Sequence, residues 1–271
     1  MWILNAIEWN ISPEIFDLGF LQVRYYGLLF AIGFMVGFYI MQKFYRDADQ
    51  DPLELDNFLI YTILGGIIGA RLGHILFYEF DYYYSYPTEI LKVWHGGLAS
   101  HGGVIGVLLS TYLFSKKYKK PYLWITDRLA MPAAFIGGLI RFGNLMNSEI
   151  YGPKTDLPWG FIFTINGETV PKHPTQIYES LAYFAIAAFI WFAYKKDKGN
   201  IPFGKLTGYF LSLVFTARFF IEFIKNDQAA FEQGMLLNVG QLLSLPIIAI
   251  GIYLIISSKN KPTKLNATNE N

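Results

Sequence analysis

The stretch that decides both the fold and the site is residues 137–152, which read Gly137-Gly138-Leu139-Ile140-Arg141-Phe142-Gly143-Asn144-Leu145-Met146-Asn147-Ser148-Glu149-Ile150-Tyr151-Gly152. It begins as the end of an apolar run and finishes in a polar loop. On a helix, Arg141 and Asn144 lie three residues apart and share a face. An ionisable group at membrane depth costs about 2.5–3.5 kcal/mol on insertion scales, so a functional role is the first interpretation. The structural alternative is an arginine that extends from a helix end to the interface.

The composition around this stretch is that of a membrane protein. Of the 271 residues, 53% are hydrophobic, 18% are aromatic and only 16% are charged, whereas a soluble domain has about 25% charged residues. The chain has no cysteine, which excludes disulfides, thiolate metal sites and a cysteine nucleophile borne by the protein. A thiol that takes part in the chemistry must therefore come from a substrate. No pattern in the sequence indicates a cofactor, a metal or a nucleic-acid partner.

Seven apolar segments of about 20 residues predict seven transmembrane helices, because a helix of that length spans a bilayer. Their approximate bounds are 24–43, 57–78, 97–115, 128–146, 176–194, 206–225 and 238–258. We therefore expect an all-α polytopic membrane protein, with residues 1–258 as a single membrane domain. Residues 147–175 contain several prolines and an Asn-Gly step, which predict a small extracytoplasmic cap of turns and short strands. The polar residues 259–271 are expected to form a disordered cytoplasmic tail.

The distribution of basic residues predicts the orientation. Three alternate connections and the tail hold most of them, namely Lys43, Arg46, Lys116, Lys117, Lys119, Lys120, Lys195, Lys196, Lys198, Lys205, Lys259, Lys261 and Lys264. The opposite side has only Lys92, Lys154, Lys172 and Lys225. By the positive-inside rule the C-terminus is cytoplasmic, and seven spans place the N-terminus outside. The remaining basic residues are arginines in or at the edge of a span, where a guanidinium can bind phosphate through two hydrogen bonds. They are Arg24, Arg71, Arg128, Arg141 and Arg218.

Two His-Gly-Gly steps, at residues 95–97 and 101–103, lead into the third apolar segment. Each glycine costs a helix roughly 1 kcal/mol relative to alanine, so we expect irregular backbone in both steps. A histidine can exchange a proton near neutral pH. We interpret His101 as functional and His95 as a hydrogen-bond partner between helices. Two histidines without a nearby pattern of carboxylate ligands do not indicate a metal site.

In the sixth segment Arg218, Glu222 and Lys225 are spaced to share one helix face. One interpretation is a buried structural Arg–Glu pair. The other is that Glu222 holds an arginine whose guanidinium also reaches an anionic headgroup. Composition and spacing thus predict a seven-span protein with an arginine-lined, phosphate-compatible site facing outward, but they do not specify a reaction.

Other features are interpreted as structural. Gly65, Gly69 and Gly73 recur every four residues in the second segment, which favours close packing of helices. Thr175 is expected to cap the fifth helix, with Glu179 in a polar network beside it.

Arg141-Phe142-Gly143-Asn144, followed by Asn147-Ser148-Glu149 and Gly152, resembles the signature of the bacterial prolipoprotein diacylglyceryl transferases. Other landmarks of that family have similar counterparts in the same order, covering about residues 10–255. They are Tyr26-Gly27, His101-Gly102-Gly103, the segment 173–179, Arg218 with Glu222, and the segment 240–246. Ile140 and Leu145 depart from the signature, which usually has Gly and Phe there. Lys225-Asn226-Asp227 stands where the family often has Arg-x-Pro-Asp, which leaves the role of Lys225 open.

The resemblance implies an enzyme of the bacterial inner membrane with its active site toward the outer leaflet. Its substrates would be phosphatidylglycerol and a prolipoprotein whose signal peptide ends in a lipobox cysteine. The diacylglyceryl group would pass to the cysteine sulfur, forming a thioether and releasing glycerol phosphate. Neither a cofactor nor a metal is implied.

The resemblance also implies residue roles. His101 would take the thiol proton, since a free thiol is mostly protonated at neutral pH, and Arg141 with Arg218 would stabilise the departing phosphate. Asn144 and Tyr26 would donate hydrogen bonds to the headgroup, and Glu222 would orient Arg218. In a different arrangement, the arginines lower the pKa of the thiol and His101 only positions the lipid. The substrate-binding residues implied are Tyr26, Arg141, Asn144, Glu149, Arg218 and Glu222, with Glu149 shaping the loop beside Asn147.

Two other classes of protein remain open at this point. A transporter or channel for an anionic solute or lipid would show repeats and broken helices in both halves, and no repeat is evident. A non-catalytic lipid-binding protein would keep its function after His101→Ala.

Overall fold

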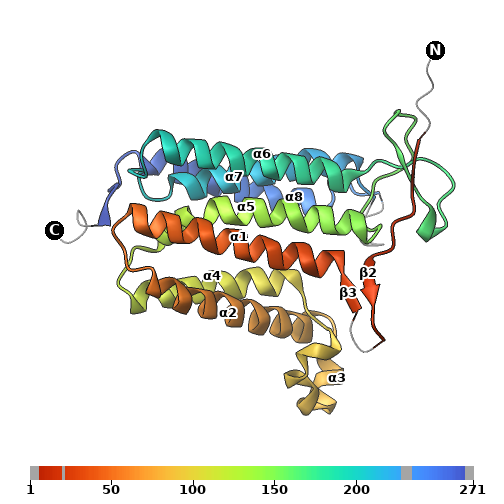
Figure 1. The fold of residues 1–271 in the computed structure, drawn as a ribbon, viewed down its shortest axis with the longest axis horizontal. Coiled ribbons are helices and arrows are strands. Elements are labelled where there is room, and N and C mark those ends of the chain that lie inside the picture. Colours follow the sequence, from red (N-terminus) through yellow and green to blue (C-terminus); the bar gives the residue numbers. More distant parts are fainter. Residues whose placement is uncertain (1–5, 20–21, 227–233, 266–271) are drawn as a thin grey trace. The chain divides into compact units, whose positions relative to one another are not determined.

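The structure is a computed structural model that describes residues 6–19, 22–226 and 234–265. The described chain divides into two compact units, the first made of parts of 6–41 and 127–265 and the second of residues 42–126. Figure 1 shows the helices and strands along the chain. The division falls within two helices, α1 (Tyr25–Asp47) and α5 (Tyr122–Met146). Each of these helices belongs to the first unit for most of its length.

The first unit is a set of long helices. Besides α1 and α5 it contains α6 (Thr175–Lys196), α7 (Lys205–Ile221) and α8 (Val239–Ser258), and the 3-10 turn η4 (Glu222–Ile224) follows α7. Helix α7 packs against both α6 and α8. Asn238 begins α8 with a capping box, because Gln241 N donates to Asn238 Oδ1 (2.9 Å) and Asn238 N donates to Gln241 Oε1 (3.0 Å).

A buried carboxylate joins α5 to the start of α7. Asp127 is 2% exposed, and its side chain accepts hydrogen bonds from Gly204 N (2.6 Å), Thr207 N (2.8 Å) and Thr207 Oγ (2.8 Å). The first N–H groups of a helix have no partner within it and carry partial positive charge. Asp127 therefore acts as the cap of α7 from a neighbouring helix.

The connection between α5 and α6 contains a short strand, as the sequence predicted. Strand β4 (Phe161–Phe163) pairs in parallel with β1 (Ile7–Trp9), and the 3-10 turn η3 (Thr164–Asn166) follows it. Leu145, Phe161 and Phe163 form a buried core there, and Trp9 packs on it while donating from Nε1 to Leu145 O (3.1 Å). A second, antiparallel pair joins β2 (Glu14–Asp17) to β3 (Gln22–Arg24). The pairing of the N-terminal strand β1 with this connection was not predicted from the sequence.

The second unit is built on two helices in close contact. Helix α2 (Leu53–Phe77) packs against α4 (Ser100–Lys117). The chain that connects them contains α3 (Phe80–Ser85) and the 3-10 turns η1 (Pro87–Leu91) and η2 (Val93–His95). Glycines permit the approach, since a Cβ added to Gly73 would lie 2.8 Å from Gly102 Cα, and one added to Gly69 would clash with Gly102 O. The structural interpretation of the repeated glycines in α2 is confirmed.

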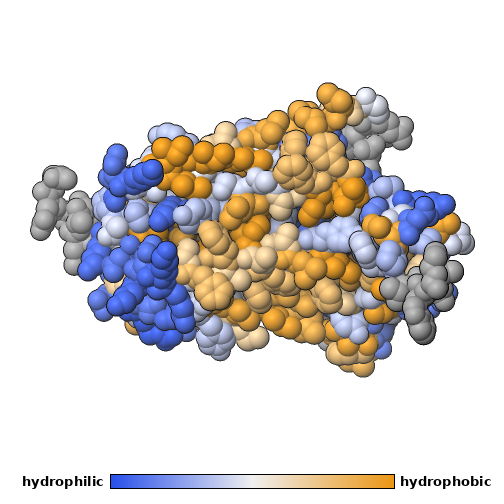
Figure 2. Space-filling model, turned by 90° about the horizontal axis from the view of Figure 1, so that it is seen from above, coloured by the Kyte–Doolittle hydropathy of each residue, from blue (hydrophilic) through white to orange (hydrophobic). Residues whose placement is uncertain are grey.

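All seven segments predicted to span the membrane are helical, with bounds that differ by a few residues. Within the described ranges, six helices are long and apolar enough to cross a bilayer: α1, α2, α5, α6, residues 205–224, and α8. Helix α4 falls outside this set because its glycines, hydroxyl residues and two terminal lysines lower its hydropathy. Figure 2 shows hydrophobic residues over much of the surface in that view, with hydrophilic residues gathered toward its ends. A polytopic membrane protein is the architecture that such a surface fits.

The expected tail, residues 259–271, lies partly outside the described residues, which end at 265. Before that point Phe203 N donates to Pro262 O (3.1 Å), which ties the beginning of the tail to the α6–α7 connection.

Candidate functional site

The end of α5 carries a chain of hydrogen-bonded polar side chains. Arg141 Nη1 donates to Asn144 Oδ1 (3.3 Å), as expected for residues on one helix face. Asn144 Nδ2 in turn donates to Glu149 Oε1 (2.7 Å), and Asn147 Nδ2 donates to the same oxygen (3.1 Å). Asn144 is only 5% exposed. The polar residues of the signature stretch therefore form one connected group in which each holds the next.

The loop after α5 is held in an unfavourable backbone conformation. Ser148 and Ile150 have φ values of +53° and +62°, the left-handed region that a β-branched residue such as isoleucine rarely adopts. The first turn of α6 holds this loop through two hydrogen bonds. Gln176 Nε2 donates to Glu149 O (2.6 Å), and Thr175 Oγ1 donates to Ile150 O (2.8 Å). Thr175 is thus the first residue of α6 and not its cap, which corrects the sequence prediction. Strain that the surroundings enforce in this way is typical of functional loops.

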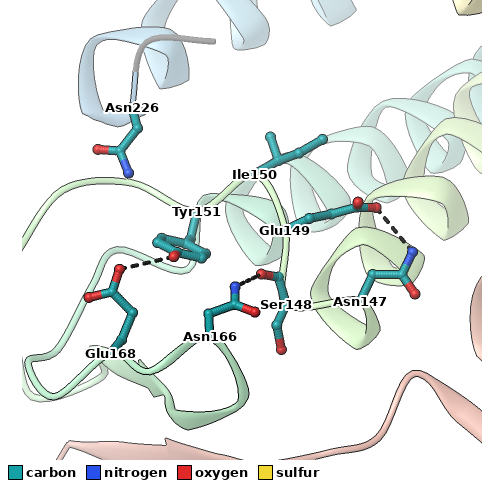
Figure 3. A pocket seen from close by; sticks show the side chains of 8 residues that line it. All are labelled: Asn147, Ser148, Glu149, Ile150, Tyr151, Asn166, Glu168 and Asn226. Carbon is teal, nitrogen blue, oxygen red and sulfur yellow. Dashed lines mark hydrogen bonds between the residues drawn. The ribbon is translucent and has the colours of Figure 1, made fainter.

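A polar hollow of about 380 Å³ lies beside this loop (Figure 3). Asn166 Nδ2 donates to Ser148 O (2.6 Å) and Tyr151 OH donates to Glu168 Oε1 (2.9 Å) along its wall. Burial raises the pKa of the Glu168 carboxyl, but hydrogen bonds from Lys172 and Tyr151 outweigh this and hold the pKa below its ordinary value. Glu168 is therefore an anionic acceptor on this wall at neutral pH.

Three buried ion pairs lie beneath the signature stretch. Arg141 Nε is 3.1 Å from Glu179 Oε2, and Lys225 Nζ is 3.4 Å from Glu179 Oε1 and 3.3 Å from Glu222 Oε2. The side chains of Glu179, Lys225 and Glu222 are 0%, 3% and 4% exposed, whereas that of Arg141 is 17% exposed. Arg141 is thus the member of this network with the most accessible side chain.

Two glycines of the signature stretch allow close approaches. A Cβ on Gly143 would lie 2.8 Å from Cδ2 of Tyr26, so the ring of Tyr26 lies directly against the end of α5. A Cβ on Gly152 would lie 2.9 Å from His173 Cβ and would clash with Ile224 O, which shows that the loop, α6 and η4 meet at this point. Tyr26, Asn144 and Glu149 therefore lie close to Arg141, and their binding of substrate stays a prediction.

Arg218 and Glu222 do not form the predicted pair. Among the described residues no ion pair joins them, and Glu222 pairs with Lys225 instead. Glu222 N still donates to Arg218 O, the four-residue hydrogen bond of an α-helix, so the helical spacing is kept, but the Glu222 carboxylate pairs with Lys225. Lys225 therefore forms the ion pair with Glu222 that this interpretation gave to Arg218, and a role of Glu222 in orienting Arg218 stays a prediction.

His101 belongs to the second unit, in the first turn of α4, where its side chain is exposed. Irregular backbone was expected in both His-Gly-Gly steps, and it occurs only in the first, where Gly96 and Gly97 have φ values of +87° and +70°. The second step is regular helix, because Gly102 is used for packing against α2. His95 Nδ1 lies 3.1 Å from Glu89 Oε2. This is an exposed contact between the neighbouring turns η1 and η2 and not the predicted hydrogen bond between membrane helices.

Arg71 holds the segment that precedes His101. It is 4% exposed, and its guanidinium donates to backbone carbonyls of residues 89–97, including Ile90 O (3.0 Å) and Gly97 O (3.1 Å), while its Cζ lies 4.7 Å from the centroid of the Tyr83 ring. The hydrogen bond from Lys92 has the largest effect on the pKa of the Glu89 carboxyl, and together with the hydrogen bond to His95 it holds that pKa below its ordinary value. The buried arginine of α2 is therefore satisfied by backbone and has a structural role.

Comparison with known proteins agrees with these features. The family model described as prolipoprotein diacylglyceryl transferase matches residues 13–257. The chain belongs to the prolipoprotein diacylglyceryl transferase family. Proteins named phosphatidylglycerol–prolipoprotein diacylglyceryl transferase are 48% identical in Tolumonas auensis, 46% in Chloroherpeton thalassium and 42% in Porphyromonas gingivalis. The matches cover 93–94% of this chain and 95–98% of these relatives. The resemblance seen in the transferase signature at residues 141–152 is thereby confirmed.

Proposed function

We propose that this chain transfers the diacylglyceryl group of phosphatidylglycerol to the lipobox cysteine of prolipoproteins, the first step of bacterial lipoprotein maturation. The observation that carries the proposal is the family match over nearly the whole chain, joined to a partly accessible arginine held by buried partners in the signature stretch. The relatives carry this activity in their names.

The reaction is a displacement at carbon. The cysteine sulfur forms a bond to the terminal glycerol carbon of the diacylglyceryl group, and the bond from that carbon to the phosphate oxygen breaks. Glycerol phosphate leaves with the electron pair, and the thiol proton passes to a base. The step therefore requires a cation where negative charge grows on the departing phosphate.

Arg141 is suited to that role. A guanidinium has five N–H donors in a rigid plane and matches phosphate geometry. Glu179 orients Arg141 through Nε, Asn144 accepts from Nη1, and the Tyr183 hydroxyl is a further partner. Because these partners occupy only some of its five N–H donors, Arg141 can bind phosphate without leaving its position. Asn144, whose amide is already bonded to Arg141 and Glu149, acts by holding Arg141 in place.

The remaining roles follow from the family resemblance. Arg218 supplies a second cation at the phosphate, Tyr26 donates a hydrogen bond to the headgroup, and His101 either takes the thiol proton or positions the lipid. The chain would sit in the inner membrane with seven spans including α4, the N-terminus outside, and the site toward the outer leaflet, where phosphatidylglycerol and the exported signal peptide both lie.

The test uses purified protein in phosphatidylglycerol micelles with a synthetic lipobox peptide, and follows the peptide by mass. We expect the wild-type chain to add one diacylglyceryl unit to the peptide, and Arg141→Lys to lower the rate by about 10²- to 10³-fold, since one preorganised donor of this kind contributes that much. Arg24→Gln is the matched control, because Arg24 is an exposed arginine of the same unit that pairs with Glu14.

A peptide with serine in place of cysteine should gain no mass, which would show that sulfur accepts the group. Absence of transfer by folded wild-type protein would contradict the proposed activity. Equal rates for Arg141→Lys and wild type would contradict the role of Arg141 alone.

A further inference from the structure

The charges beneath Arg141 are balanced by one lysine. Glu179 and Glu222 are buried carboxylates that lie 46 and 3 residues from Lys225 in the chain, and Lys225 Nζ contacts both. A buried charge is tolerated when an opposite charge or hydrogen bonds satisfy it, and it is strongly unfavourable otherwise. Two buried anions here require two cations, and Arg141 with Lys225 are those that form ion pairs with them among the described residues.

Glu222 is held on its other side by the start of α8. A Cβ on Gly240 would lie 2.5 Å from Glu222 Oε1, so the first turn of α8 packs directly on the carboxylate. The N-terminal end of a helix carries partial positive charge and favours an anion beside it. The Glu222 carboxylate therefore lies between Lys225 Nζ and the first turn of α8.

Removal of the lysine charge would change what Arg141 does. Glu179 Oε1 and Glu222 Oε2 would each lose their ion-pair partner while remaining buried. The guanidinium of Arg141, 3.1 Å from Glu179 Oε2, is then the remaining ion-pair partner of these carboxylates among the described residues. It would then be drawn inward and offer fewer donors and less net charge to a phosphate.

We propose that Lys225 is a positioning residue of the transfer site, which neutralises Glu179 and Glu222 so that Arg141 stays available to the phosphate of the lipid. The inference rests on the proposed function and assigns a task to the residue at which the chain departs from the family pattern. Lys225 itself, with a side chain 3% exposed, does not need to touch the lipid.

The experiment is a charge-compensation cycle with Lys225→Met, Glu222→Gln, the double variant and Lys225→Arg. Two quantities are measured: kcat/KM for transfer to the lipobox peptide, and binding of phosphatidylglycerol without peptide, in nanodiscs of zwitterionic lipid. We expect Lys225→Met to lower both by about 10- to 100-fold, the range found when a residue that supports a ligand-binding side chain is removed. Lys225→Arg keeps the charge and should retain most of both.

The double variant decides the question. Removing one cation together with one anion restores the balance, so Lys225→Met with Glu222→Gln should recover most of the lipid binding that Lys225→Met loses. A double variant that melts like the wild type but binds lipid no better than Lys225→Met would overturn the proposal, as would wild-type binding by Lys225→Met. Wild-type protein that binds lipid but transfers nothing would refute the proposed function and leave this inference to be judged on binding.

Discussion

At the residue scale, arginines of similar sequence context have different tasks. Arg141 and Arg71 both lie in apolar helices, but Arg71 donates to backbone carbonyls and lies over the Tyr83 ring, whereas Arg141 faces side chains. Backbone carbonyls satisfy a guanidinium without supplying an orientation for a ligand. The partners of an arginine, which sequence does not reveal, therefore separate a structural from a functional interpretation.

Arg71→Met should destabilise the protein. The substitution removes the hydrogen bonds that a buried guanidinium donates to carbonyls of residues 89–97, and a hydrogen bond from a charged group contributes about 1.5–3 kcal/mol. We expect the free energy of unfolding to fall by about 3 kcal/mol or more, measured by thermal or denaturant unfolding in detergent. The control is Lys43→Met, which breaks an exposed pair with Asp47 and should change stability by less than about 1 kcal/mol. Equal stability of the two variants would contradict the structural role of Arg71.

Of the local side-chain pairs that the sequence predicted within the described residues, Arg141–Asn144 is present and Arg218–Glu222 is not, and the contacts between elements were missed. The Arg141–Asn144 hydrogen bond follows from helix spacing and is present. Glu179 was expected in a polar network at the start of its helix, yet its partners are Arg141 and Lys225, 38 and 46 residues away. The role of Lys225 was left open because the chain departs there from the family pattern, and its contact with Glu179 forms only when α6 packs near η4. Its spacing from Glu222 did predict that these two side chains share a face, and they form an ion pair.

At the element scale, the glycine spacing in α2 predicted that α2 packs closely against another helix. It did not predict that this helix is α4. The partner glycines of α4 were interpreted as signs of irregular backbone, and they are instead the other half of the contact. The strand β1 could not be predicted, because three residues pair in parallel with a segment more than 150 positions away. Such pairing has no local signature in sequence.

Two glycines of α2 give a matched test of this packing. A Cβ on Gly66 would lie 3.5 Å from Val107 Cγ2, an ordinary contact, whereas one on Gly69 would clash with Gly102 O and lie 2.8 Å from Gly106 Cα. Gly66→Ala should leave stability unchanged or raise it by up to about 1 kcal/mol through helix propensity. Gly69→Ala should lower it, by about 1–3 kcal/mol, because α2 and α4 must separate. Unfolding of both variants in the same detergent measures the difference, and a Gly69→Ala protein as stable as Gly66→Ala would contradict the observed packing.

At the scale of the whole molecule, the sequence predicted the class of protein and its family more fully than the structure alone would. Exposed apolar side chains cover helices in both units, such as Leu64 and Ile68 of α2 and Phe192 of α6. This surface agrees with a polytopic membrane protein. Orientation, in contrast, rests on where lysines and arginines fall along the chain, which is a property of sequence that no packing contact reports.

The absence of cysteine makes orientation directly testable, since each substituted cysteine is the only thiol in the chain. Thr88→Cys, Thr169→Cys, Lys116→Cys and Asn200→Cys each place a thiol at an exposed position. With α4 as a seventh span, an impermeant maleimide should label positions 88 and 169 in intact spheroplasts. Positions 116 and 200 should react only after permeabilisation. Because Thr88 precedes α4 and Lys116 lies at its end, these two positions decide whether α4 crosses the membrane. Labelling of both positions 88 and 116 in intact spheroplasts would show that α4 does not cross the membrane. Labelling of position 169 only after permeabilisation would place the 147–174 connection, with Arg141 beside it, on the cytoplasmic side, away from exported substrates.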